Sequence, residues 1–350
     1  MQKLSGLQPQ WFSLVIGTLS ISLVLYVLSL AFSIPFLFTL GKYVFIAVLV
    51  IFWIVFILWI YRYILSPPNL KNDLSQPETL SFTALLGVLF YAGAFFYITY
   101  FAPDSTTLVI ILYLYFIVYC FIMAVNIVLN YMVYTGKVKI EDVNYVFIIP
   151  SIVMGASVIL SSVLIPSPYF SGNKGILTDI YITTLLGFAV SVFQFIFYGS
   201  AVFVSFMMGR KKTYSMPTTM MPLGAVSMFV INLMLIPTFN SLKIFYFPKP
   251  FAETLSIALW GVEILYFFVG SAVLFSGIGK IRSLSVWAYV FPVGISVFSD
   301  FLLWDFLGYY VFKIVIVAIS VIILLYYIYA MSVTMGMMFS KEITRSGSGK

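Results

Sequence analysis

Ten long apolar segments, separated by short polar connections, dominate the pattern of the chain. A helix needs roughly 20 apolar residues to cross a hydrocarbon core of about 30 Å, and each segment is long enough. The pattern therefore predicts an all-α integral membrane protein with ten transmembrane helices. We expect one domain over residues 1–340 and a short tail at 341–350, whose closing RSGSGK is either native or a cloning remnant. The predicted spans are Trp11–Phe32, Tyr43–Leu65, Leu80–Phe101, Thr106–Tyr134, Val143–Ile165, Ile176–Met208, Met216–Phe239, Phe251–Phe275, Leu284–Trp304 and Tyr309–Phe339.

Prolines recur along this pattern about 70 residues apart, each opening or interrupting an odd-numbered span, and a glycine follows each within ten residues. An interval of this length holds two spans, so the repeat predicts five consecutive helical hairpins. Proline bends a membrane helix where protein or water satisfies the freed carbonyl. We therefore expect the five bent odd helices to form an inner ring and the five even helices an outer ring. The candidate pore-lining or helix-kink residues are Gly17, Pro77, Gly87, Pro150, Gly155, Pro222, Gly224, Pro292 and Gly294.

Two simpler explanations of these residues stay open. Proline favours the first turn of any helix, and small residues also allow membrane helices to pack closely. Serines and threonines in the odd spans, such as Ser20, Ser157 and Ser296, are candidates either for a narrow aqueous path or for such packing.

Composition narrows the function. Hydrophobic residues make up 63% of the 350 residues and charged residues 8%, against roughly 25% charged residues in soluble domains. The chain has no histidine and one cysteine, Cys120, which argues against histidine-ligated haem, the common zinc sites and an internal disulfide. No phosphate-binding loop or nucleophile motif is present. We expect no cofactor, no metal and no enzymatic activity.

The net charge of +7 is better explained by the orientation of the chain in the membrane than by binding of an acidic partner. Basic residues are concentrated in the connections on one side of the predicted membrane, which predicts that both termini are cytoplasmic in a multi-pass plasma-membrane protein. No cleavable signal peptide is evident, and no nucleic-acid partner is expected. The predicted inner side carries Lys3, Arg62, Lys71, Lys137, Lys139, Arg210, Lys211, Lys212, Lys280, Arg282, Lys341, Arg345 and Lys350; the outer side carries Lys42, Lys174, Lys243, Lys249 and Lys313.

Five motifs lie in order along residues 9–300, one in each predicted hairpin. They are PQWFSLVIGTLSIS, NDLSQPETLSF, NYVFIIPSIVMGAS, MGRKKTYSMPTTMMPLGAVS and WAYVFPVGISVFSD. Each is weak alone, but together they resemble the tellurite-resistance/dicarboxylate transporter family. This family includes malate permeases, fungal sulfite efflux pumps and the plant guard-cell slow anion channel.

The resemblance implies five hairpins with quasi-fivefold symmetry, a homotrimer in the lipid bilayer, and one pore per subunit. It also implies that Phe291, before Pro292, is the phenylalanine that gates the pore. The expected function is passive passage of small inorganic or organic anions. The alternatives are a proton-coupled carrier or exporter of C4-dicarboxylates such as malate or of sulfite, and a membrane scaffold subunit that transports nothing.

Two acids fall inside predicted spans. Glu263 lies midway along the eighth span, and Asp300 lies toward the outer end of the ninth, where the family more often has a small or hydroxyl residue. An ionised carboxylate in hydrocarbon is costly, so such residues face a cavity, pair, or hold a proton. Either acid is a possible charge or proton site. For Asp300, an ion pair with Lys313 is the alternative.

Overall fold

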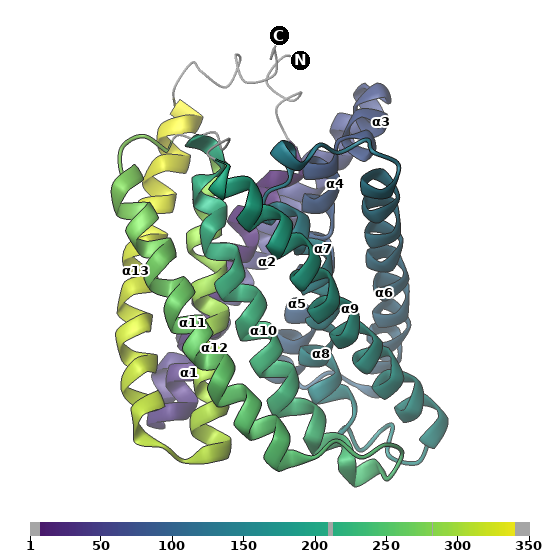
Figure 1. The fold of residues 1–350 in the computed structure, drawn as a ribbon. Coiled ribbons are helices and arrows are strands. Elements are labelled where there is room, and N and C mark those ends of the chain that lie inside the picture. The colour runs from purple at the N-terminus through teal and green to yellow at the C-terminus, as the bar shows by residue number, and fades with distance from the viewer. Residues whose placement is uncertain (1–7, 209–212, 282, 340–350) are drawn as a thin grey trace.

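The structure, a computed structural model, describes residues 8–208, 213–281 and 283–339. Every regular element within these ranges is a helix, and ten spans are long and apolar enough to cross a membrane. Pro9 and Phe339 lie at the same end of the bundle, which we call the proximal end (Figure 1); the opposite end is the distal end. The predicted tail at 341–350 lies outside the described residues.

The even spans are uninterrupted α-helices. At most 39% of the most apolar stretch of each is buried, and large side chains such as Trp53, Phe193 and Phe268 are exposed on them. A helix that is apolar all round and exposed on one side is suited to contact with lipid. These outer helices are α2 (Pro35–Leu65), α6 (Ser105–Tyr134), α9 (Lys174–Met207), α11 (Lys249–Gly277) and α13 (Tyr310–Phe339).

The odd spans are broken into successive helical segments, and at least 56% of the most apolar stretch of each is buried. A proline stands in the first turn of α4, α7, α10 and α12, where its missing N–H and fixed φ are tolerated. At the prolines of α7, α10 and α12 both explanations hold: each proline occupies the first turn of a helix, and that helix begins at a break within the span. The segments are η1 (Pro9–Trp11) with α1 (Phe12–Phe32); α4 (Pro77–Thr83) with α5 (Leu85–Phe101); η3 (Tyr145–Ile148) with α7 (Ile149–Gly155) and α8 (Ser157–Leu164); η4 (Thr213–Met220) with α10 (Met221–Leu235) and η5 (Ile236–Leu242); and η6 (Leu284–Tyr289) with α12 (Phe291–Leu307).

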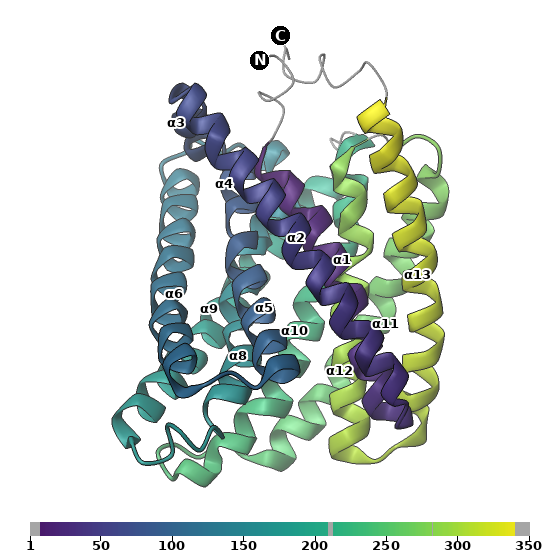
Figure 2. The same ribbon diagram turned by 180° about the vertical axis from the view of Figure 1, so that it is seen from behind.

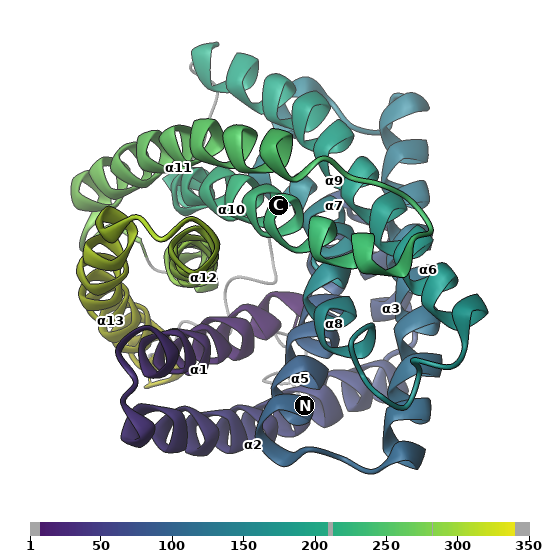
Figure 3. The same ribbon diagram turned by 90° about the horizontal axis from the view of Figure 1, so that it is seen from below.

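The broken spans form a closed inner ring. Helix α1 packs against α5, α5 against α7 and α8, these against α10, α10 against α12, and α12 against α1. Figure 3 shows this ring along its axis, with the intact helices outside it. The predicted architecture of two rings built from five hairpins is confirmed.

Two short elements were not predicted. Helix α3 (Pro68–Ser75) lies at the proximal end between α2 and α4, and Figure 2 shows it beyond the end of the long, tilted α2. The other, η2 (Ile140–Asp142), lies in the connection that follows α6. Both are too short and too polar to appear in a hydropathy pattern.

The described basic residues separate by end as expected. Helix α2 ends at the proximal end with Arg62, and α11 and α13 begin at the distal end with Lys249 and Lys313 nearby. Lys3, Arg210 to Lys212, Arg282 and the lysines and arginine of the tail lie outside the described residues. Which end faces the cytoplasm stays a prediction.

Asparagines from neighbouring helices support the breaks in the inner ring. Nδ2 of Asn232, which is fully buried on α10, donates to the carbonyl of Gly155 at 3.0 Å, where α7 ends. Nδ2 of Asn126 on α6 donates to the carbonyl of Pro150 at 3.1 Å. A backbone carbonyl without a partner in the membrane interior costs several kcal/mol, so these amides compensate for the interrupted helix.

We expect Asn232→Leu to lower the melting temperature of the purified protein in detergent. The substitution keeps the side-chain volume but leaves the Gly155 carbonyl without its partner, a cost of about 1–3 kcal/mol. The matched control is Asn72→Leu, because the side chain of Asn72 is exposed on α3. Equal melting temperatures for the two variants would show that Asn232 does not support the break.

Candidate functional site

Phe291 is the first residue of α12. Its side chain is half-buried, whereas its neighbours Val290, Pro292 and Val293 are buried. Helix α12 packs against α1, α10, α11 and α13, and its remaining side faces the axis of the inner ring (Figure 3). Phe291 packs against the hydrophobic core and keeps some exposure, and its function as a gate stays a prediction.

The repeat glycines lie at close contacts between helices. A Cβ on Gly17 would lie 2.3 Å from the Trp287 ring, and one on Gly294 would lie 2.5 Å from Cβ of Ser20. A side chain at either position would therefore force α1 or its neighbour on the ninth span to shift. A Cβ on Gly87 would lie 2.0 Å from Cδ1 of Ile122, and those on Gly155 and Gly224 would lie 3.0 Å from Ser191 and 3.1 Å from Pro292, which are tight contacts. Close packing accounts for all five glycines; their role in lining a pore stays a prediction.

Many hydroxyls of the inner ring bond to their own helices. Ser20 donates to the carbonyl of Ile16 at 3.0 Å and Ser157 to that of Met154 at 2.8 Å. Ser296 likewise donates to the carbonyl of Val293 at 2.8 Å. All three serines are buried. Their hydrogen bonds are therefore satisfied without water, as the packing alternative requires.

Asp300 is not paired with Lys313, so that alternative was wrong. Oδ1 of Asp300 accepts a hydrogen bond from Nε1 of Trp260 on α11 at 2.7 Å, and Asp300 is only 1% exposed. The ammonium group of Lys313 lies 4.7 Å from the ring centres of Phe32 and Trp304, where a cation–π attraction replaces an ion pair. Asp300 therefore faces the contact between α11 and α12.

The structure brings the two intramembrane acids together. The hydroxyl of Ser299 lies 3.1 and 2.9 Å from the two carboxylate oxygens of Glu263, and Ser299 precedes Asp300 on α12. Glu263 is 3% exposed, and the Asp300 carboxyl acts on it electrostatically. The sequence singled out both acids but gave no sign that they are neighbours.

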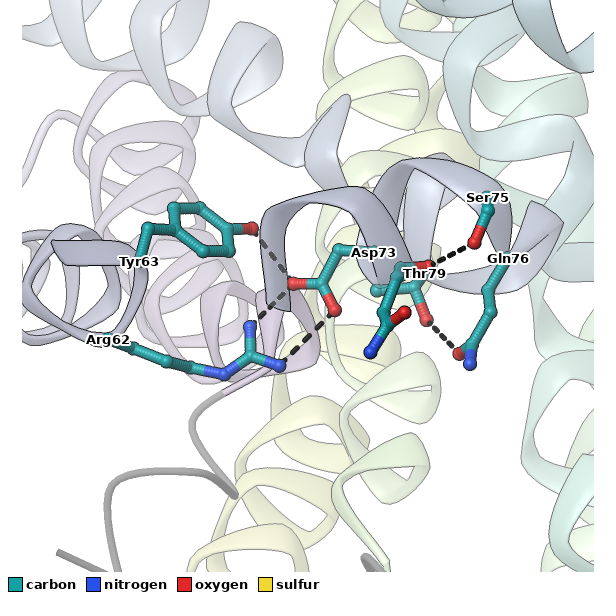
Figure 4. A network of polar contacts seen from close by, with 7 residues as sticks. Arg62, Tyr63, Asp73, Ser75, Gln76 and Thr79 are labelled. Atoms are coloured by element: carbon teal, nitrogen blue, oxygen red, sulfur yellow. Dashed lines mark hydrogen bonds and ion pairs between the residues drawn. The ribbon is translucent and has the colours of Figure 1, made fainter. Parts of the chain in front are cut away.

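A buried ion pair that was not predicted from the sequence lies at the proximal end. Arg62 on α2 donates to both carboxylate oxygens of Asp73 on α3, at 2.5 and 3.2 Å, and the hydroxyl of Tyr63 donates to the same carboxylate at 2.8 Å (Figure 4). Arg62 is 5% and Asp73 3% exposed. A bidentate arginine–carboxylate pair fixes orientation as well as position, so this contact anchors α3 to the end of α2.

One signal was available in the sequence for this pair. Arg62 is the single cation of the predicted second span, Tyr43–Leu65, and Asp73 begins an Asp-Leu-x-x-Pro sequence in the motif NDLSQPETLSF. A charged residue so close to hydrocarbon usually has a partner of opposite charge. Asp73 is the first acidic residue that follows Arg62 in the sequence. Elsewhere in the described ranges, no group of three or more Cys, Asp or Glu side chains is arranged to hold a metal ion.

Comparison with known proteins agrees with this architecture. The sequence profile of the SLAC1 family, described as voltage-dependent anion channel, matches residues 6–335. The chain is also 22% identical over 349 residues to an uncharacterized transporter of Methanocaldococcus jannaschii, with 97% of each chain covered. The family match covers nine spans and most of the tenth, and it places the protein among channels and transporters, not enzymes. The chain belongs to the SLAC1 family of anion channels.

Proposed function

We propose that this protein is a passive channel or permease for small anions, with a pore along the axis of the inner ring. The observation that carries the proposal is the closed ring of five broken helices inside five intact ones. The intact helices present apolar side chains to lipid, which leaves the ring axis as the path through the protein. Because the family is one of anion channels, we expect the transported ion to be negatively charged.

The charge pattern favours flux over tight capture. Helices α1, α5, α7, α8, α10 and α12 contain no lysine or arginine. Attraction of anions then depends on basic residues at the two ends, on helix N-termini and on hydroxyl groups, which bind anions weakly. Weak binding at several sites allows an ion to enter and also to leave.

Phe291 is our candidate for the gate. A phenyl ring across a narrow, apolar constriction blocks ions by steric occlusion and by excluding water. The half-buried ring at the start of α12 has this chemistry, and its rotation about the side-chain torsions would open the path. In this proposal residues 1–340 form one domain that assembles as a homotrimer in the plasma membrane, with the proximal end cytoplasmic.

Anion substitution in planar bilayers tests the channel. We expect the current of the purified protein to reverse at the equilibrium potential of the permeant anion, with no shift when a proton gradient is imposed. A reversal potential that follows the proton gradient would favour a proton-coupled carrier of malate-like dicarboxylates or sulfite. Liposomes that release no radiolabelled chloride, nitrate, malate or sulfite above the empty-vesicle rate would favour the scaffold alternative.

A further inference from the structure

Helices α10, α11 and α12 meet in a three-helix contact that contains both buried acids. Glu263 projects from α11 between Ser299 of α12 and Ser227 of α10. Asp300 of α12 accepts from Trp260, which precedes Glu263 by one helical turn on α11. We call these side chains the acid seam: Ser227, Trp260, Glu263, Ser299 and Asp300.

No cation neutralises the two acids within the helices that surround them. Helices α10 and α12 contain no lysine or arginine. On α11, Nζ of Lys249 lies 3.6 Å from Glu253, and on α13 Lys313 lies over two aromatic rings. Among the described side chains of α1, α10, α11, α12, α13, η6 and the connection before α13, the other titratable groups are Asp305, which is exposed, and the hydroxyls of Tyr26, Tyr266, Tyr289, Tyr309, Tyr310, Tyr326, Tyr327 and Tyr329.

Two ionised carboxylates side by side in a medium of low dielectric constant repel each other and lose their hydration. A proton bound to either carboxyl removes one of the two charges. Oδ2 of Asp300 is buried and has no hydrogen-bond partner, although Oδ1 of the same carboxyl is occupied by Trp260. A carboxylate oxygen can accept a proton, so this free oxygen is where one would bind.

A second buried atom without a partner extends the acid seam toward the distal end. Oγ of Ser256 on α11 has no hydrogen-bond partner, and Ser256 is 0% exposed. It lies one helical turn before Trp260, on the same face of α11. One turn further, Ala252 and Glu253 line a cavity of about 130 Å³ at the distal end, together with Met234 of α10 and Phe306 of α12.

These polar positions therefore follow one another along the contact of α11 with α10 and α12, without a continuous chain of hydrogen bonds. The series leads from the distal cavity past Ser256 to Asp300 and ends at Glu263, with α10, α11 and α12 contributing side chains at both ends. Steps of three and four residues keep all these positions on one face of α11. This series lies on the outer side of the inner ring, between α11 and its two inner neighbours, and is distinct from the ring axis.

We propose that Glu263 and Asp300 form a shared proton-binding site, reached from the distal end along the acid seam, and that its occupancy regulates the pore. A proton from water in the distal cavity binds to the pair and reduces its charge from two to one, without any redox or covalent step. The electrostatic repulsion between α11 and α12 then falls, and α12 is the helix that begins with Phe291. The regulatory part rests on the proposed channel function; the proton site does not.

Infrared difference spectroscopy during a pH titration of the purified protein in nanodiscs tests the site without any transport. We expect the carbonyl band of a protonated carboxylic acid to change with pH in the parent and to be lost from that position in Glu263→Gln and Asp300→Asn. The intrinsic fluorescence of Trp260, measured as the difference between the parent and Trp260→Phe, should change over the same pH range. The matched control is Asp305→Asn on the exposed face of α12, which should keep the parental band.

A parent with no buried-carboxyl band at any pH would overturn the proton site, and this measurement requires no variant to fold. A band that persists unchanged in both acid variants would overturn it as well.

Chloride flux from liposomes tests the regulation. We expect the flux of the parent and of Asp305→Asn to depend on the pH at the distal side, and that dependence to be lost in Glu263→Gln and Asp300→Asn while the flux itself remains. Absence of flux in the parent would sink the proposed channel and leave the infrared result standing. Protons carried in a fixed ratio with the anion would overturn the regulatory role and make the pair part of a carrier.

Discussion

Replacing Phe291 with alanine is expected to raise anion conductance several-fold in planar bilayers. The ring belongs to a residue that is half-buried at the start of α12, among neighbours that are buried. If it closes the path along the ring axis, its removal joins the spaces on either side and admits water, so ions no longer meet a dry constriction. The open probability and the single-channel current of Phe291→Ala and the parent give the comparison.

The matched control for this experiment is Phe301→Ala. Phe301 lies on the same helix, is 8% exposed and packs against Phe298 and Trp304. Removing a packed phenylalanine costs about 3–5 kcal/mol, so this variant should melt at a lower temperature with unchanged conductance. If Phe291→Ala behaves in the same way, Phe291 is an ordinary core residue and the gate must be sought elsewhere along the axis.

The fold was predictable because the bilayer imposes a simple requirement on length. A span needs about 20 apolar residues, and the observed spans begin and end close to the predicted ones, as in Thr106–Tyr134 against Ser105–Tyr134 for the fourth. The largest difference is in the second span, where α2 begins at Pro35 and not at Tyr43. There Thr39 and Lys42 lowered the hydropathy without ending the helix.

The two rings were also predictable, because proline marks where a helix is interrupted. Pro150, Pro222 and Pro292 stand in the first turns of α7, α10 and α12, where each of these inner spans is interrupted. The outer helices have no such interruption. What the sequence does not contain is the direction of each side chain. A helix that is apolar on all sides gives no hydrophobic face to read, so the partners across the helix contacts stayed unknown.

The intramembrane acids show this limit. Their rarity in apolar spans made Glu263 and Asp300 candidates, but the partner of Asp300 stayed open, with an ion pair to Lys313 as one alternative. In the structure the carboxyl faces α11 and accepts from Trp260, while Lys313 is over aromatic rings. The direction in which α12 presents this side chain separates the two outcomes, and packing against the neighbouring helices decides it.

Removal of Asp73 is expected to cause the largest loss of stability. Asp73→Ala leaves the guanidinium of Arg62 buried at the end of α2 without its carboxylate. Breaking a buried ion pair from one side costs about 3–5 kcal/mol, so the melting temperature in detergent should fall steeply. Glu253→Ala is the comparison, because its pair with Lys249 is partly exposed and such pairs contribute about 0–1 kcal/mol.

The double variant Arg62→Met with Asp73→Leu separates charge from anchoring. It removes both charges and keeps apolar volume, so most of the stability should return, as is common when a whole buried pair is replaced. Orientation is a different matter, since α3 connects α2 to α4, the first segment of an inner span. If the bidentate pair holds that connection in place, the double variant should be stable and yet differ from the parent in chloride flux. A double variant as unstable as Asp73→Ala would show that the lost contacts, and not the unpaired arginine, account for the effect.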